Sequence, residues 1–166
     1  MSDKELCGFN TTLQQVDKNY SWINDMIKQR QELVVLYMKL LNLPLHKEMN
    51  ELEFIPSYEQ ITEFCEHLID YVSHGHFDLY PKIIELMENA SGRSLSIANR
   101  VMPKIEGTTE YLMRFNDKYA EDLNELKMAT LKKDLSQVGK CLELRFKSED
   151  RLIIGLRLIN TIVSSS

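Results

Sequence analysis

The sequence contains little of what builds flexible linkers, membrane spans or secretory leaders. Its 166 residues include only 6 Gly and 4 Pro, which leaves little room for linkers between domains. No run of about 18 or more apolar residues is present, so no segment is expected to span a membrane. The N-terminus also lacks an apolar stretch of signal-peptide length. We therefore expect one domain over residues 1–166, with an N-terminal arm at 1–12 and a frayed tail at 164–166.

Cysteine is also scarce, and acidic residues outnumber basic ones. The three cysteines, Cys7, Cys65 and Cys141, are far apart and lack the spacing of a metal-binding pair, which predicts reduced thiols in a cytoplasmic protein. The formal net charge of −5 gives no basic footprint for direct contact with nucleic acid. A partner with a basic surface suits this charge better.

Motifs of nucleophilic enzymes and of phosphate-binding loops are absent, because the chain has no GxSxG, GxxxxGK[ST] or GxGxxG. Carboxylate-bridged di-iron bundles require Glu-x-x-His, whereas here Glu63 lies four residues before His67. The remaining histidines are His46, His74 and His76. We therefore expect no enzymatic activity, no metal site and no cofactor.

The chain does contain two long apolar seams with helical spacing, which lines one face of a helix that packs on other helices. In the N-terminal third, steps of three and four connect Leu13, Val16, Tyr20, Ile23, Ile27, Val34, Tyr37 and Leu41. In the C-terminal third, the seam comprises Leu131, Leu135, Val138, Leu142, Leu152, Leu156, Ile159 and Val163. The two seams predict long helices at both ends of the chain.

Breaker and capping residues divide the first half of the chain into two helices. The first is expected over residues 13–42, before Pro44. Ser57, with Gln60 three residues later, predicts a capping box at the start of the second. Gly75 is expected to interrupt this second helix, and Asp78 to cap its second piece. The inner stripe of the second helix is predicted at Tyr58, Ile61, Cys65, Leu68 and Val72.

Two more helices are expected in the second half. Pro103 should kink or restart the third helix, residues 122–130 are interpreted as a connection, and the fourth helix covers residues 131–163. No strand-like alternation competes with this interpretation. The predicted fold class is all-α, an antiparallel up-and-down four-helix bundle with a broken second helix and an N-terminal extension.

Charged residues interrupt both seams near their middle. Arg30 fills one slot of the first seam, and Arg145 and Glu149 fill two slots of the second, with Asp150 adjacent. An ion inside such a seam must be paired or solvated, because isolated burial is costly. We expect these four residues to form a polar core. This core either fixes the register of the helices or forms a cavity for a ligand or a partner side chain.

The segment HLIDYVSHGHFDLYPKII, residues 67–84, combines a glycine, three aromatic residues and Asp70. Asp70 should point away from the inner stripe because it lies two residues from both Leu68 and Val72. Aromatic residues beside a helix break either cover the end of a bundle or anchor a protein interface. The residue types leave both interpretations open.

Three stretches, LVVLYMKLLNL, FCEHLIDYVSHGHFDLYPKI and LELRFKSEDRLI, resemble the bacterial family of the regulator of sigma D (Rsd) and AlgQ, over residues 25–158. The resemblance implies an all-helical anti-sigma factor. Such a protein binds the primary sigma factor of RNA polymerase, chiefly the C-terminal region that recognises the −35 promoter element. It regulates transcription by holding sigma away from core polymerase in stationary phase.

The resemblance also implies which residues are functional. Sigma binding is assigned to Asp70 and Phe77, with neighbours Tyr71, Ser73, His76 and Tyr80. The family's polar core corresponds to Arg30, Arg145, Glu149 and Asp150. The protein is expected to be a monomer without direct contact to nucleic acid.

Other partners and functions remain open at this point. A phosphocarrier protein of the sugar phosphotransferase system or a stringent-response enzyme could be a partner. The alternative function is a metabolite- or phosphocarrier-responsive sensor or adaptor that uses the polar core, and a third is a pure scaffold. The long N-terminal arm and the segment NASGRSLS depart from the family pattern.

Overall fold

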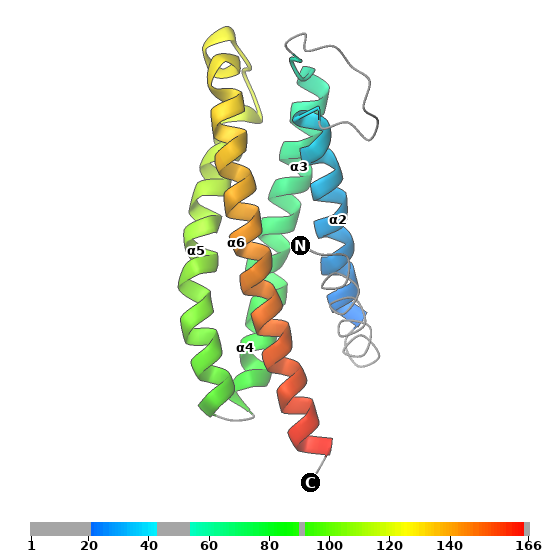
Figure 1. Ribbon diagram of the computed structural model, residues 1–166, viewed down its shortest axis with the longest axis vertical. Coiled ribbons are helices and arrows are strands. Elements are labelled where there is room, and N and C mark those ends of the chain that lie inside the picture. The colour runs from blue at the N-terminus through cyan, green and yellow to red at the C-terminus, as the bar shows by residue number, and fades with distance from the viewer. Residues whose placement is uncertain (1–20, 43–53, 90–91, 165–166) are drawn as a thin grey trace.

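The computed structural model describes residues 21–42, 54–89 and 92–164, which are helical apart from short connections and contain no strand. The predicted all-α helical bundle is therefore confirmed over these residues. In Figure 1 the chain rises along α2, descends through α3 and α4, rises along α5 and descends along α6. The elements are α2 (Ser21–Leu40), α3 (Tyr58–His74), the π-helical segment η1 (Gly75–Leu79), α4 (Tyr80–Glu88), α5 (Gly92–Tyr119) and α6 (Glu125–Ser164).

The start of α3 is the predicted capping box. The Ser57 hydroxyl accepts the Gln60 backbone N–H at 3.2 Å, and the Gln60 side chain accepts the Ser57 N–H at 3.0 Å. These two bonds satisfy donors that the first helical turn leaves free. Tyr58, predicted in the inner stripe, is instead 59% exposed. The rest of that stripe is buried as predicted.

The predicted break at Gly75 takes the form of a change in helix type. The chain remains helical through η1 and passes directly into α4. Asp78 lies exposed within η1, so its predicted capping role is wrong, and α4 begins without a side-chain cap. Pro81 occupies the first turn of α4 directly after η1, so one backbone N–H donor is missing at the junction of the two segments.

Helices α5 and α6 are longer than predicted. Pro103 lies inside α5, which continues through it without a restart. Helix α6 begins at Glu125, so the predicted connection over 122–130 is wrong beyond residue 124. The Asn124 side chain accepts the Lys127 N–H at 2.9 Å and thereby caps the new start. Because α6 includes Ser164, only 165–166 of the predicted tail lie outside the described residues, as does the arm at 1–12.

The seam of α6 is confirmed wherever its side chains are described. Six of its apolar members are buried, namely Leu131, Leu135, Val138, Leu142, Leu152 and Leu156. The predicted seam of α2 is confirmed at Ile23, which is buried, but beyond it the buried stripe is rotated by one residue: Met26 and Leu33 are buried, while Ile27 and Val34 are half-buried. Leu13, Val16 and Tyr20 lie outside the described residues. Either stripe satisfies the heptad spacing, so contacts with other helices, rather than local pattern, select which one faces inward.

The core consists of two apolar clusters separated along the bundle. One combines the C-terminal half of α2 with α3, the end of α5 and the start of α6. The other combines the start of α2 with α4, the start of α5 and the later part of α6. Arg145, Glu149 and Thr108 are buried between the two clusters. The interrupted slots of the seams therefore coincide with a polar layer across the bundle.

Candidate functional site

The centre of the polar layer is the carboxylate of Glu149, which is 1% exposed. One of its oxygens, Oε1, accepts hydrogen bonds from the hydroxyl of Tyr80 at 2.6 Å and from the hydroxyl of Tyr71. The Nε of Arg145 lies 3.6 Å from the same oxygen. Side chains from α3, α4 and α6 thus meet at one atom of Glu149.

Arg145 is fully buried and is held mainly by α5. Its Nη1 donates to Thr109 Oγ1 at 2.6 Å, to Thr108 Oγ1 at 3.2 Å and to the Ile105 carbonyl at 3.4 Å. Sequence reasoning missed both threonines. A signal for Thr108 was present, because Ile105, Thr108 and Leu112 follow steps of three and four along the buried stripe of α5.

Arg30 and Asp150 lie at the more accessible edge of the layer. Arg30 Nη1 is 2.7 Å from Asp150 Oδ1 and 3.8 Å from Glu149 Oε2, and its guanidinium group stacks 4.5 Å from the Phe146 ring centre. The side chains of Arg30 and Asp150 are 13% and 17% exposed. The structure therefore brings together the four residues predicted for the polar core, and the ion pairs of Arg30 connect α2 to α6.

Burial controls the ionisation of this layer. Desolvation raises the pKa of Tyr71 well above its ordinary value, and the negative charge of Glu149 adds to the rise. The pKa of Tyr80 is raised for the same two reasons, so both phenols stay neutral and can donate. Burial alone would lower the pKa of Arg145, but Tyr71, Tyr80 and Glu149 outweigh it and the pKa is raised. The layer therefore holds the charged guanidinium group of Arg145 beside Glu149.

The π-helical segment explains how two tyrosines from one continuous helical stretch reach the same oxygen. Tyr71 and Tyr80 are nine residues apart, and in a regular α-helix nine residues turn by about 900°, which places side chains on opposite faces. The wider turns of η1 reduce this rotation, so that both rings face inward. The absence of a side chain at Gly75 leaves space for the Tyr80 ring, since a Cβ atom at this position would lie only 2.8 Å from the Tyr80 hydroxyl. π-Helical segments occur frequently at functional sites.

The outward face of the same stretch carries Asp70, His76 and Phe77, all exposed. Phe77 is 73% exposed, and the His76 ring meets it edge to face with the ring centres 4.9 Å apart. Ser73 is half-buried. A large apolar ring exposed beside carboxylates is the type of group that anchors protein interfaces.

The six residues predicted for partner binding are therefore divided between surface and interior. Tyr71 and Tyr80 are each 2% exposed and lie in the polar core with Glu149, so their predicted part in partner binding stays a prediction. The spacing of Tyr71, three residues after the buried Leu68, already indicated an inward direction. Asp70 points outward, as its distance from Leu68 and Val72 predicts.

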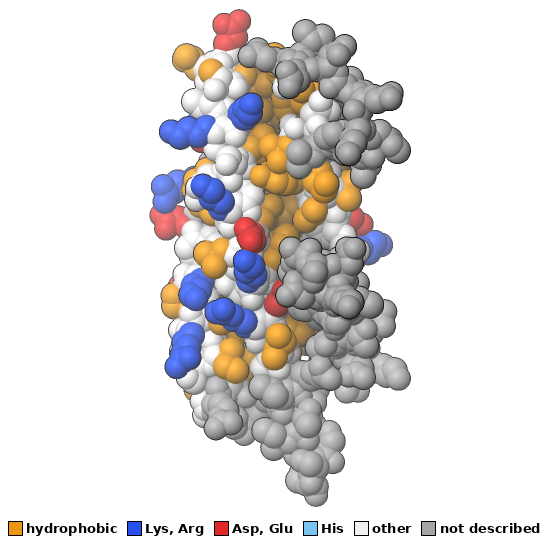
Figure 2. Space-filling model, in the orientation of Figure 1, with side chains coloured by type: hydrophobic (Ala, Val, Ile, Leu, Met, Phe, Trp, Pro, Cys, Tyr) orange, Lys and Arg blue, Asp and Glu red, His pale blue; other side chains and the backbone are white. Residues whose placement is uncertain are grey.

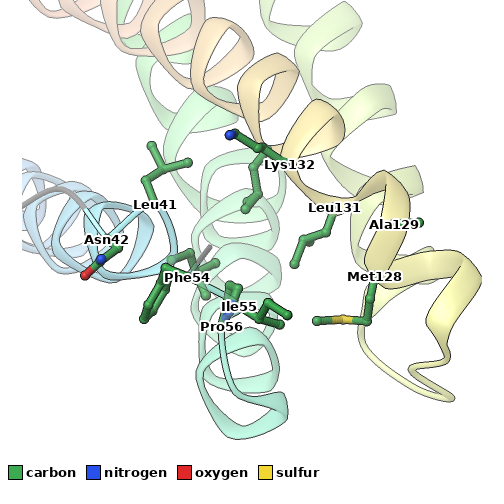
Figure 3. A pocket seen from close by; sticks show the side chains of 11 residues that line it. Leu41, Asn42, Phe54, Ile55, Pro56, Met128, Ala129, Leu131 and Lys132 are labelled. Carbon is green, nitrogen blue, oxygen red and sulfur yellow. The ribbon is translucent and has the colours of Figure 1, made fainter. Parts of the chain in front are cut away.

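Two of the grooves on the described part of the surface lie at different places along the bundle. A groove of about 420 Å³ lies between α4 and α5, with His76 at one end and Tyr80 and Thr109 among its lining residues. A second, of about 620 Å³, lies where α2 ends and α3 and α6 begin, and its lining is mostly apolar (Figure 3). Neither groove is lined by Arg145 or Glu149, so neither opens onto the centre of the polar layer.

The part of the chain that the structure describes has neither a metal-binding cluster nor a membrane-spanning helix. No group of three His, Cys, Asp or Glu side chains is placed there to hold a metal ion. None of its helices combines the length and apolar character needed to cross a membrane. Cys65 and Cys141 are buried free thiols, and burial raises the pKa of Cys65 to about 12.

Comparison with known proteins shows the family to which this chain is similar. The sequence profile of the family described as "Regulator of RNA polymerase sigma(70) subunit, Rsd/AlgQ" matches residues 6–157. The chain belongs to the Rsd/AlgQ family. Its helical bundle, polar layer and exposed η1 segment are therefore those of a member of a family of sigma-70 regulators.

Several relatives in this family are named "Regulator of sigma D". The protein from Yersinia enterocolitica serotype O:8 / biotype 1B is 30% identical over 145 residues, covering 84% of this chain and 83% of its own. The one from Pectobacterium atrosepticum is 30% identical over 139 residues, covering 83% of this chain and 89% of its own. The similarity thus spans most of both proteins, and the family resemblance seen in the sequence is confirmed.

Proposed function

We propose that the protein is an anti-sigma factor that binds the C-terminal, −35-recognising region of the primary sigma factor and withholds it from core RNA polymerase. The observation that carries this proposal is the exposed face formed by Asp70, His76 and Phe77, on a segment whose inner face is fixed to Glu149. Membership in a family of sigma-70 regulators supports the choice of partner.

The chemistry of this face suits such a partner. Phe77 offers an exposed ring that can fill an apolar pocket, and Asp70 offers a carboxylate for an Arg or Lys beside that pocket. The DNA-recognising region of a sigma factor carries basic residues, and this chain has a formal net charge of −5. Association should therefore be accelerated by electrostatic attraction and slowed by salt.

The polar layer supports binding indirectly. Tyr71 and Tyr80 hold the stretch that contains η1 from within, so Phe77 is presented without a large ordering cost on association. In this account the protein acts by occupying a surface of sigma, as a cytoplasmic monomer, without a catalytic step or a cofactor.

The proposal is tested by titrating the purified protein with the C-terminal region of a primary sigma factor, followed by competition with core polymerase. We expect a saturable complex, slower association at high salt, and loss of holoenzyme as the protein is added. A phosphocarrier of the sugar phosphotransferase system and a stringent-response enzyme serve as parallel titrants. Absence of a complex with sigma, together with binding to one of the parallel titrants, would contradict the proposal.

A further inference from the structure

The groove between α4 and α5 is lined by apolar and by acidic residues. The apolar residues are Pro81, Ile84, Met102 and Ile105. Its charged rim is formed by Glu85, Glu88 and Glu106, all exposed. Among the described residues that line it there is no Lys or Arg. An apolar channel of about 420 Å³ bordered by three carboxylates has the composition of a site for a cationic, amphipathic ligand.

This groove is continuous with the exposed face of η1. His76 lines one end of the groove and also contacts Phe77 edge to face, with ring centres 4.9 Å apart. A partner that covers Phe77 therefore reaches the mouth of the groove through His76. The other boundary is formed by Thr109, which accepts from Arg145, and by Tyr80, which donates to Glu149. Two lining residues of the groove are therefore hydrogen-bonded to the polar layer.

The acidic rim of the groove differs in charge from other parts of the surface. On the face shown in Figure 2, Lys and Arg side chains gather over α5 and α6. Among the residues of α6 whose side chains are described, five cations are exposed, namely Lys132, Lys133, Lys140, Lys147 and Arg151. The larger groove at the other end of the bundle has Lys132 as its one charged lining residue within the described chain. Three carboxylates therefore line the α4–α5 groove and one lysine lines the larger groove, and this difference in charge favours a basic partner at the α4–α5 groove.

We infer that the α4–α5 groove receives a basic amphipathic helix of the sigma partner, with apolar side chains on Ile84 and Met102 and Lys or Arg side chains against Glu85, Glu88 and Glu106. The inference rests on the proposed function and extends its interface from Phe77 into the groove. Helical ligands of this type place residues at i, i+3, i+4 and i+7 in an apolar channel, with charges on both borders fixing the register.

Charge reversal separates this inference from the proposed function. The double variant Glu85→Lys/Glu106→Lys reverses the rim at two exposed positions. A control, Glu121→Lys/Glu125→Lys, makes the same charge change at the α5–α6 connection, at the opposite end of the bundle (Figure 1). We expect the rim variant to weaken binding of the sigma C-terminal region by about tenfold or more, and the control by about twofold at most.

Occupancy of the groove is read directly by methyl NMR of the full chain. Adding the sigma region should shift the Met102 and Ile84 methyl signals, while the Met38 methyl, on α2 and 38% exposed, should stay in place. The groove inference is wrong if the rim variant binds sigma as well as its control does and the Met102 signal does not shift. The proposed function still stands in that case, provided that wild-type protein binds sigma and Asp70→Ala weakens the binding. If wild-type protein does not bind sigma, both are wrong.

Discussion

The stretch that contains residues 70–80 has two faces that differ in exposure, charge and bonding. Tyr71 and Tyr80 are each 2% exposed and donate hydrogen bonds to Glu149. Phe77 is 73% exposed, and Asp70 lies on the surface with it. The difference teaches that aromatic residues close in sequence can have separate roles: the inner pair stabilises the fold, whereas the outer residues remain available to a partner. Substitutions on the two faces should therefore affect different measurements.

The largest effect is expected for Glu149→Ala, on the inner face. The variant removes the acceptor of two buried phenols and leaves Arg145 without its buried counter-charge. Breaking a buried ion pair by removing one partner costs about 3–5 kcal/mol, so the free energy of unfolding in urea should fall by about 3 kcal/mol or more. The matched control is Glu143→Ala on the same helix, where an exposed pair with Lys147 is lost.

The control should leave the midpoint of urea unfolding unchanged, because exposed ion pairs contribute little. A small effect of Glu149→Ala, within about 0.5 kcal/mol, is the range of ordinary surface substitutions. Such a result would remove Glu149 from the polar layer and erase the distinction between the two faces.

Gly75→Ala tests how the inner face is built. A Cβ atom at this position would lie 2.8 Å from the Tyr80 hydroxyl and 2.9 Å from its Cζ, so the ring must move away from Glu149. Overpacking of this kind costs about 1–3 kcal/mol. Gly107→Ala in α5 is the control, because nothing lies within 4 Å of a Cβ there. The control should gain about 0.5–1 kcal/mol from the better helix propensity of alanine.

Urea unfolding of both glycine variants measures this contrast. Destabilisation by Gly75→Ala together with stabilisation by Gly107→Ala is the expected pattern. Equal stabilisation by both would show that the ring of Tyr80 does not press on the backbone at Gly75, and the described packing of η1 would be wrong.

A smaller effect is expected at alkaline pH. Burial and Glu149 raise the pKa of Tyr71 and Tyr80 above the ordinary value of 10.0, so the unfolded chain loses these protons first as pH rises. Stability from the two phenols is therefore complete below pH 10 and declines above it. Urea unfolding of wild type and of Tyr71→Phe/Tyr80→Phe at several alkaline pH values measures this. The wild type should lose stability more steeply; parallel curves would contradict the pKa directions.

Periodicity predicted much of this molecule because some features are local. The α6 seam and its charged slots at Arg145 and Glu149 followed directly from spacing. The rotation of α2 could not be predicted, since two apolar stripes one residue apart fit the same heptad and only contacts with other helices choose between them. The helix start at Glu125 was missed because the Asn124 cap precedes a polar stretch rather than an apolar one.

The candidate site was only partly predictable, for a related reason. The direction of Asp70 follows from its position between buried Leu68 and Val72. Tyr80 faces inward only because η1 changes the helical turn. The inward position is stabilised by a hydrogen bond to Glu149, 69 residues away in the sequence. A pattern confined to a few residues contains no information about so distant a partner.

The central claim, that the outer face of residues 70–80 binds sigma while the inner face stabilises the fold, is tested most directly by calorimetric titration of Asp70→Ala with the sigma C-terminal region. Glu121→Ala, an exposed carboxylate at the α5–α6 connection, is the matched control. The account predicts that Asp70→Ala loses roughly 1–3 kcal/mol of binding free energy, the range of an interface anchor, with an unchanged urea midpoint. Normal binding by Asp70→Ala, or its unfolding, would contradict the claim.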